Sequence, residues 1–537
     1  MERKERLNLT IRILSQATRP SILARPFYYP LNITTYISLN MELESTPLII
    51  GKRWKDISEQ VNSNYNFNQN SVGGSQAGVN SSNLMLYDAV VDMYGHGDHV
   101  TIQDAINAGK RRIYVRAGNY TLESDVNLVS NLLIKGESQE NTIITLKSYK
   151  FTGVGDTTYS VGDVVLTNGS DIVTGVGTSW LANLSIGDYF IITGASFKII
   201  AVNSDTEIQI ENDYEGISAT FLRYYAGTFL SNIEISDITL QGSTGTAGIY
   251  LYGTIKSFIH NLRVIDNSLT VTYGIDAKWT YLSKIKDVEC SNNYYGIRFW
   301  NSRFNSFESI LVSNNGWTGM YLLGGDFFQV SNLKSFSNKN NGLSINTGYY
   351  LNLNNILVEN NVGYGIKLDT TLFVQMSNCM SIDSGSNGYY IVDSSNISLN
   401  NCLSYTNSGI GFYCLRVNNI EVLGCQSVEN QGQGFYNLAV TASSFIGNSS
   451  LNNAKGATNA YSDFYFGEDG GVYSTGNTVK GNTAYALLTN KTRYGFNFVD
   501  ANEDYNVIEG NVCKGQLVGT YFHPGTNGEK GHNIMIP

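Results

Sequence analysis

Residues 365–369, Gly-Ile-Lys-Leu-Asp, and residues 388–392, Gly-Tyr-Tyr-Ile-Val, decide the fold, because one is the counterpart of the other 23 positions along the chain. The same step places a glycine before an apolar residue seven times, at Gly296, Gly319, Gly342, Gly365, Gly388, Gly411 and Gly434. Short apolar runs that return at a fixed period and are bounded by turn residues are typical of a solenoid. The repeat therefore predicts stacked coils of about 23 residues.

Two neighbouring columns follow the same step. The first is polar and contains Asn332, Asn355, Asn378 and Asn401; the second is apolar and contains Ile310, Leu333, Ile356, Cys379, Cys402 and Cys425. Asparagine tolerates the left-handed conformation of a sharp corner, so we expect the polar column to form a buried amide ladder from coil to coil. We expect Cys379, Cys402 and Cys425 to be buried free thiols.

Composition limits the function classes. The chain has 537 residues, 36 of them Tyr and 54 Gly, and only 15% are charged, which favours short strands and tight turns over helices. A net charge of −10 argues against a nucleic-acid partner. No apolar run of 18 residues predicts a membrane span, and no usual secretion signal is visible. Six cysteines match neither a disulfide framework nor a zinc pattern.

Shifts in composition predict four segments. Residues 1–85 combine prolines and arginines with an Asn/Ser/Gly-rich linker, and we interpret them as an N-terminal attachment region. Residues 86–154 contain a short amphipathic helix over 101–108 and three β runs, the first coils. Residues 155–225 interrupt the pattern and predict a small inserted β module. Residues 226–537 form the main β-helix.

Two resemblances follow from these segments. The helix at 101–108 followed by β runs from Arg112, Leu132 and Thr142 resembles the start of pectate-lyase-like β-helices, where a small helix caps the first coil. This resemblance implies an all-β, right-handed parallel β-helix. The order of turns in the insert, Thr167-Asn-Gly-Ser170, Gly177-Thr-Ser-Trp180, Gly187-Asp188 and Ser204-Asp-Thr206, resembles β modules of bacteriophage tail and fibre proteins. It implies a virion protein of the tailspike type.

The outward residues after the repeat glycines provide the candidate binding surface. The predicted substrate-binding residues are Asp276, Arg298, Trp300, Tyr321, Lys367 and Tyr390, with Lys278 and Asn346 beside them. Aromatic rings stack on the apolar faces of sugars, and charged groups bond to their hydroxyls. The competing interpretation is a soluble sheet face, because Tyr is a good strand former and charges keep a sheet in solution.

Candidate catalytic residues are fewer. Asp369 and Asp393 lie on adjacent coils and could form the carboxylate pair of a glycoside hydrolase, whereas Arg298 beside Asp276 would suit a lyase or epimerase. Weak surface ion pairs would explain the same residues. His96 and His99 lie in a Gly-rich turn without a third ligand nearby, so we expect no metal and no cofactor.

These observations predict a virion spike or tail-fibre protein, located on the virion surface, that binds a host-surface polysaccharide with or without depolymerase activity. Its N-terminal region would contact other virion proteins, and the spikes that it resembles are homotrimers. The alternative is a cellular, extracellular carbohydrate-active enzyme of the pectate-lyase-like superfamily, a lyase, hydrolase or epimerase. Whether the chain is an enzyme stays open at this point.

Overall fold

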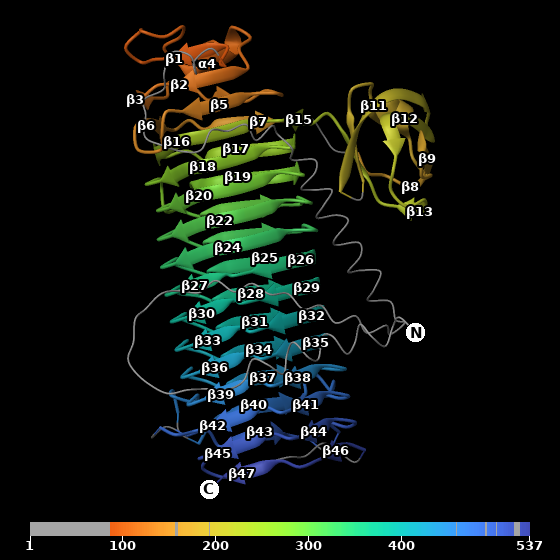
Figure 1. Cartoon of the computed structure of the whole chain (residues 1–537), viewed down its shortest axis with the longest axis vertical. Coiled ribbons are helices and arrows are strands. Elements are labelled where there is room, and N and C mark those ends of the chain that lie inside the picture. Colours follow the sequence, from red (N-terminus) through yellow and green to blue (C-terminus); the bar gives the residue numbers. More distant parts are fainter. Residues whose placement is uncertain are drawn as a thin grey trace, which may run out of the picture. The chain divides into compact units, whose positions relative to one another are not determined.

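The computed structural model describes residues 86–155, 159–192, 194–457, 459–488, 491–500, 502–519 and 527–536. Apart from one small inserted sheet, the described chain forms a parallel β-helix, in which each strand pairs in parallel with its counterpart in the next coil (Figure 1). The predicted all-β solenoid with coils of about 23 residues is confirmed. The predicted attachment region, 1–85, lies outside the described residues.

One side of the coils is a 14-stranded sheet, which we call the glycine-repeat sheet because half of its strands directly follow the repeat glycines. Its strands are β4 (Val126–Asn127), β7 (Phe151–Val154), β15 (Leu230–Ser231), β17 (Ala247–Ile255), β19 (Tyr273–Tyr281), β21 (Ile297–Trp300), β23 (Met320–Leu323), β25 (Leu343–Asn346), β28 (Ile366–Asp369), β31 (Tyr389–Val392), β34 (Phe412–Leu415), β37 (Phe435–Leu438), β40 (Ser462–Gly467) and β43 (Tyr494–Phe498).

The remaining sides belong to a 26-stranded parallel assembly. In the early coils it contains β1 (Ala89–Val91), β2 (Arg112–Val115), β3 (Gly118–Thr121), β5 (Leu133–Gly136), β6 (Thr142–Lys147), β16 (Glu234–Ser243), β18 (Phe258–Ile265), β20 (Lys284–Ser291), β22 (Ser306–Ser313) and β24 (Gln329–Phe336). Beyond β24, each long strand is replaced by two shorter ones, so that later coils have three sides.

One series of these shorter strands contains β26 (Tyr349–Asn354), β29 (Leu372–Ser377), β32 (Ser395–Asn400), β35 (Asn418–Leu423), β38 (Ser444–Ile446), β41 (Thr478–Lys480), β44 (Val507–Glu509) and β46 (Glu529–Lys530). The other contains β27 (Leu357–Glu359), β30 (Met380–Ile382), β33 (Leu403–Tyr405), β36 (Gln426–Val428), β39 (Ser449–Leu451), β42 (Thr483–Tyr485), β45 (Val512–Lys514) and β47 (Ile534–Ile536).

The predicted asparagine column lies at the corner between these two series. Asn332, Asn355, Asn378 and Asn401 all have the left-handed conformation, with φ between 51° and 55°, and Asn355 donates a 2.6 Å bond to Asn332. The corner geometry was predicted correctly. The prediction that this column is buried is wrong, because all four side chains are exposed. Water can replace their coil-to-coil bonds.

A different set of asparagines forms the buried ladder. Its members are Asn293, Asn315, Asn338 and Asn361 in one run and Asn407, Asn430 and Asn453 in another. Asn338 donates from Nδ2 to Oδ1 of Asn361 at 2.9 Å and accepts from Nδ2 of Asn315 at 2.8 Å. Their backbone N–H groups bond to the same Oδ1 atoms of the next coil, so each amide satisfies two neighbouring coils.

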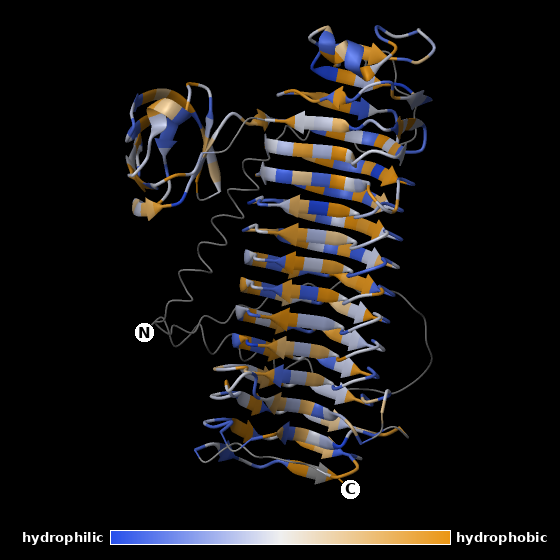
Figure 2. Ribbon diagram, turned by 180° about the vertical axis from the view of Figure 1, so that it is seen from behind, coloured by the Kyte–Doolittle hydropathy of each residue, from blue (hydrophilic) through white to orange (hydrophobic). Residues whose placement is uncertain are grey.

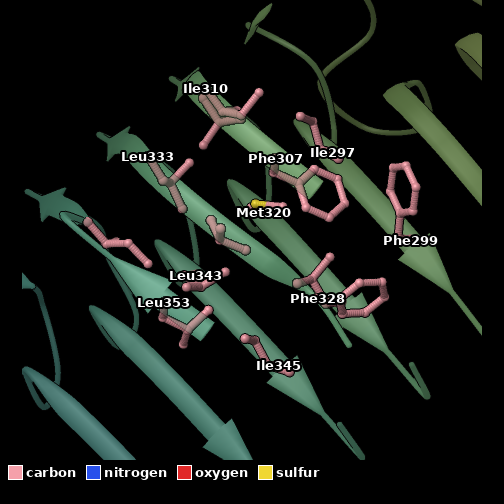
Figure 3. Close-up of a cluster of buried hydrophobic side chains, with 14 of the residues drawn as sticks. Ile297, Phe299, Phe307, Ile310, Met320, Phe328, Leu333, Leu343, Ile345 and Leu353 are labelled. Atoms are coloured by element: carbon pink, nitrogen blue, oxygen red, sulfur yellow. The ribbon is translucent and has the colours of Figure 1, made fainter. Parts of the chain in front are cut away.

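Inward residues form one continuous hydrophobic core, because successive residues of a strand point to opposite faces. Hydrophobic and hydrophilic positions are interspersed along the strands (Figure 2). Figure 3 shows its middle part, where rings and aliphatic chains of β21 to β26 interlock. Cys379, Cys402 and Cys425 are buried and free, as predicted, and burial raises the pKa of the Cys379 thiol. Farther along, Phe412, Phe435, Phe464 and Phe496 stack at 4.6–4.8 Å between ring centroids.

The first coil is covered by the predicted short helix, α4 (Ile102–Asn107). Thr101 caps it by accepting the Asp104 N–H at 3.0 Å, and Ile102, Ala105 and Ile106 face the main core. No helix of the described segments is long and apolar enough to cross a membrane.

The predicted insert is a separate seven-stranded antiparallel sheet in the order β13-β8-β9-β12-β11-β10-β14. Its elements are β8 (Asp163–Leu166), β9 (Ser170–Val176), α5 (Trp180–Asn183), β10 (Tyr189–Ile192), β11 (Ala195–Ser204), β12 (Glu207–Tyr214), β13 (Ala219–Leu222) and β14 (Tyr225–Gly227). Trp180 is fully buried in its core and donates a 2.8 Å bond to the Tyr224 hydroxyl. The insert therefore has a hydrophobic core of its own.

Candidate functional site

The glycine-repeat sheet carries the predicted binding residues in two adjacent outward columns. Strand register aligns Asp276, Arg298, Tyr321, Ser344, Lys367 and Tyr390, which we call the Arg298 column. It likewise aligns Tyr252, Lys278, Trp300, Leu323, Asn346 and Asp369, which we call the Trp300 column. Side chains of neighbouring coils in one column stand about 4.8 Å apart, so they contact each other directly.

Arg298 and Asp276 form a bidentate ion pair. The Arg298 Nε and Nη2 atoms donate to the two Asp276 carboxylate oxygens, each at 2.8 Å, and Nη1 donates to the Tyr273 hydroxyl at 3.1 Å. The guanidinium also lies 4.0 Å from the centre of the Tyr273 ring. Asp276 is only 7% exposed, so this pair is rigid and its donors are largely occupied.

Trp300 lies beside this pair and is 36% exposed. The Lys278 ammonium is 4.7 Å from the centre of its ring and 5.6 Å from that of Tyr252, on the preceding coil. The Arg298 guanidinium is 5.8 Å from the Trp300 ring. Two cations therefore surround the indole, and part of its surface remains open to a ligand.

An aromatic cluster borders the Arg298 column, and most of it escaped the sequence analysis. It consists of Tyr273, Tyr294, Tyr295, Trp317 and Tyr321. Tyr295 stacks between Tyr273 and Tyr321, at 5.1 Å and 5.8 Å, and Trp317 at the rim is 42% exposed. Tyr294, Tyr295 and Trp317 stand just before repeat glycines, whereas the sequence analysis considered only the alternate residues after them. The sequence signal that could have predicted this cluster is the presence of aromatic residues just before two successive repeat glycines, Gly296 and Gly319.

The later coils of the same sheet carry a tyrosine ladder of Tyr364, Tyr390, Tyr413, Tyr436 and Tyr465. Its rings stack on one another at 4.5–5.5 Å, so each inner ring covers the faces of its neighbours. Burial raises the pKa of Tyr413 and of Tyr465 to about 12. Tyr390 thus lies in the ladder and offers a sugar its edge and hydroxyl group more than its ring face.

The two predicted catalytic carboxylates each have a cation of their own. Lys367 Nζ lies 3.0 Å from Asp369 Oδ2, within one coil. Asp393 lies at an exposed corner with φ of 50° and accepts bonds of 2.5 Å and 3.0 Å from Arg416, which also binds Asp469 at 2.7 Å. Hydrogen bonding from Arg416 lowers the pKa of Asp393, the opposite of what a general acid requires.

Two buried carboxyl groups in the last coils were not singled out from the sequence. Asp463 accepts bonds from Ser450, Thr492 and Gln516 at 2.6–2.9 Å, and burial raises its pKa to about 6. Burial also raises the pKa of Glu503 to about 7, and among the described residues its Oε1 atom has no hydrogen-bond partner. Neither side chain reaches the surface, so both belong to the core rather than to a site.

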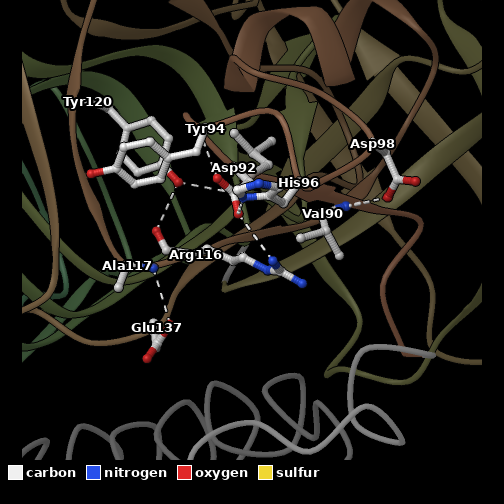
Figure 4. A network of polar contacts seen from close by, with 10 residues as sticks. Val90, Asp92, Tyr94, His96, Asp98, Arg116, Ala117, Tyr120 and Glu137 are labelled. Atoms are coloured by element: carbon white, nitrogen blue, oxygen red, sulfur yellow. Dashed lines mark hydrogen bonds and ion pairs between the residues drawn. The ribbon is translucent and has the colours of Figure 1, made fainter.

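The histidine-containing turn near the first coil has a structural role (Figure 4). Asp92 accepts from the Tyr94 N–H at 2.8 Å and from Arg116 at 3.1 Å, and these bonds lower its pKa. His96 is largely exposed, with Nδ1 4.0 Å from Asp92. Within the described ranges no three His, Cys, Asp or Glu side chains are grouped to hold a metal ion.

Comparison with known proteins defines the class of fold. The family model described as right handed beta helix region matches residues 295–454, the most regular coils, and the predicted right-handed parallel β-helix is confirmed. No curated protein matches the chain.

Several solved structures match the chain at low identity and with TM-scores below 0.5. The tailspike gp61 of Pseudomonas phage phi297 is 13% identical, with a TM-score of 0.48 over 76% of this chain and 72% of that one. The mannuronan C-5 epimerase AlgE6 A-module of Azotobacter vinelandii is 16% identical, with a TM-score of 0.39 over 81% and 93%. The gp54 tailspike of Acinetobacter baumannii bacteriophage AP22, in complex with capsular saccharide, is 10% identical, with a TM-score of 0.34 over 73% and 75%.

Proposed function

We propose that the chain binds an extended polysaccharide along the early coils of the glycine-repeat sheet. The observation that carries the proposal is the grouping of the aromatic cluster and Trp300 around the rigid Arg298–Asp276 pair. Two tryptophans at its rim, Trp300 and Trp317, are 36% and 42% exposed, although such rings are usually well covered. We call these residues the glycan site.

The parallel coils suit a linear polymer. Coils recur about every 4.8 Å, so a chain lying along the axis would meet a new row of side chains at each coil. Sugar rings can stack on the open indole surfaces, while tyrosine hydroxyl groups and the remaining Arg298 and Lys278 N–H groups bond to hydroxyls. Affinity then comes from an extended surface rather than from an enclosed pocket.

Substitution of Trp300 by Ala tests the site. We expect affinity for the bound polysaccharide to fall about tenfold, the equivalent of about 1.4 kcal/mol, because a large contact surface is lost. Binding is measured against purified bacterial and archaeal surface polysaccharides. Tyr405→Ala is the matched control, since Tyr405 is 38% exposed on β33, in a different sheet. Equal loss in both variants, or no loss in either, would contradict the glycan site.

The same experiment tests depolymerase activity when the length of the bound polymer is followed over time. The proposed catalytic residues remain Asp369 and Asp393, although each has its own cation. Asp369→Asn and Asp393→Asn should keep the affinity and abolish any shortening of the polymer. Shortening that persists in both variants would place the chemistry elsewhere.

We further propose that the chain is a homotrimeric virion spike that attaches to host-surface glycan, with residues 1–85 bound to other virion proteins. The supporting observations are the composition of residues 1–85 and the turn pattern of the insert. Deletion of residues 1–85 should remove the protein from particles and leave glycan binding intact. A truncated chain that stays on particles would contradict attachment through residues 1–85.

A further inference from the structure

Lys278 differs from the other cations on the outward columns of the glycine-repeat sheet. Arg298 is neutralised by Asp276 and Lys367 by Asp369, at 2.8 Å and 3.0 Å. Lys278 has no carboxylate of the described residues within ion-pair distance; its ammonium instead lies against the rings of Trp300 and Tyr252. A cation held by two rings keeps its full charge and its N–H donors.

The glycan site therefore has an excess of one positive charge. Its own charged residues are Arg298 and Asp276, which form an ion pair, and Lys278 adds a second cation because its ammonium lies against the Trp300 ring. The whole chain carries a formal charge of −10, so the local sign is opposite to that of the protein. A local positive charge on an acidic protein attracts anionic ligands at the point where it lies.

We infer that the polysaccharide bound at the glycan site is acidic and that Lys278 binds the anionic group of its sugars. This inference rests on the proposed function and specifies its ligand class. Lys278 lies on the open Trp300 ring, so a sugar in contact with this indole brings a substituent to the ammonium. The Arg298 donors already face Asp276 and Tyr273, which leaves Lys278 as the available charge.

The anionic group can be a carboxylate, a sulfate or a phosphate on the sugar. The Lys278 ammonium is a point charge and does not require a planar partner, so it can bind any of the three. Binding should weaken as salt is added, since the contact lies at the protein surface. Substitution of Lys278 by an uncharged residue removes only the ammonium. The rings of Trp300 and the aromatic cluster stay, so they can still stack on the sugar. The two contributions can therefore be separated by substitution.

The test is an array of purified capsular polysaccharides that includes neutral, uronate-bearing, sulfated and phosphorylated members. We expect the wild-type protein to bind acidic members. Lys278→Gln should reduce their binding about tenfold and reduce its salt dependence. Lys334→Gln, which removes one charge from an exposed position of β24, is the matched control and should change neither. Carboxyl reduction of a bound uronate polymer identifies the carboxylate as the recognised group if it lowers wild-type affinity to that of Lys278→Gln.

Each outcome decides between the two proposals. Binding of neutral polymers only, or unchanged binding of acidic ones by Lys278→Gln, overturns the acidic-ligand inference. If those polymers still lose affinity in Trp300→Ala, the glycan site stands. If Trp300→Ala and Lys278→Gln both bind like the wild type, the proposed site itself is wrong.

Discussion

The early and late coils of the glycine-repeat sheet have the same backbone but different surfaces. In the early coils, β19 to β23, rings of different size and orientation surround an ion pair, and two indoles remain open. In the late coils, β31 to β40, one residue type repeats, and the tyrosines stack on each other. Identical neighbours at 4.8 Å cover one another's faces, whereas unlike neighbours leave surface for a ligand. Repetition therefore favours stability, and its interruption favours binding.

The largest expected effect tests whether the buried asparagine ladder stabilises the early coils and the late coils equally. Asn338, under the early coils, and Asn430, under the late ones, have the same bonds to the coils before and after them. Substitution of either by Ala leaves several buried groups unpaired, so we expect a loss of about 3 kcal/mol in the free energy of unfolding. Urea denaturation measures it, with exposed Asn378→Ala as a control expected to cost less than about 1 kcal/mol. Unequal losses at Asn338 and Asn430 would mean that the scaffolds differ.

A slightly smaller effect concerns pH and the late coils alone. The pKa of Asp463 is raised from 3.8 to about 6, so the folded chain holds this proton more tightly than the unfolded chain does. Its contribution to stability is complete below pH 3.8 and is lost as the pH rises through 6. We expect wild type to lose about 2–3 kcal/mol between pH 4 and pH 7 relative to Asp463→Asn.

Denaturation curves at several pH values for the two proteins provide the measurement. Hydrogen exchange should place the difference in β40 and its neighbours, because stability in a solenoid is local. Parallel pH profiles for the two proteins would show that the pKa of Asp463 is not raised in the folded state.

The smallest expected effect comes from a comparison of one aromatic residue in the late coils, Tyr413, with one in the early coils, Trp300. Tyr413→Ala should lower the free energy of unfolding by about 1–2 kcal/mol, since a half-buried ring stacked on two others is removed. It should leave polysaccharide affinity unchanged. Trp300→Ala should show the reverse, a loss of affinity with little loss of stability. Both quantities are measured on the same samples, and a loss of affinity in Tyr413→Ala would extend the glycan site into the late coils.

The period in the sequence was sufficient to predict the coils, the two outward columns and the buried thiols. It could not identify the buried asparagine ladder, because Asn338 and Asn355 both recur at 23-residue steps. Left-handed corners change the direction of the side chains, so a period alone does not separate inward from outward residues there.

The candidate site was predicted only in part, because alternation predicts the direction of side chains in strands but not in turns. Arg298, Trp300 and Tyr321 lie in strands, where alternation predicts direction, whereas Tyr294 and Trp317 lie in the turns before the glycines. The ion pair of Asp393 with Arg416 could have been predicted from the 23-residue period, since these residues are 23 positions apart and therefore stack in neighbouring coils. The self-stacking of the tyrosines also follows from one column with one residue type.

The stack of Phe412, Phe435, Phe464 and Phe496 has a consequence for how the chain can be altered. The number of residues between successive rings rises from 23 to 29 and then to 32 (positions 412, 435, 464 and 496), yet the rings stay 4.6–4.8 Å apart. Extra residues leave the coil and rejoin it, and the inserted antiparallel sheet likewise lies between β7 and β17, which still pair in parallel. The number of residues between two stacked rings can therefore change without a change in the spacing of the core. Peptides grafted into the turns beyond Phe435, or removal of the single 23-residue coil that starts at Gly365, should leave every column aligned. The chain can therefore be lengthened or shortened to display binding surfaces.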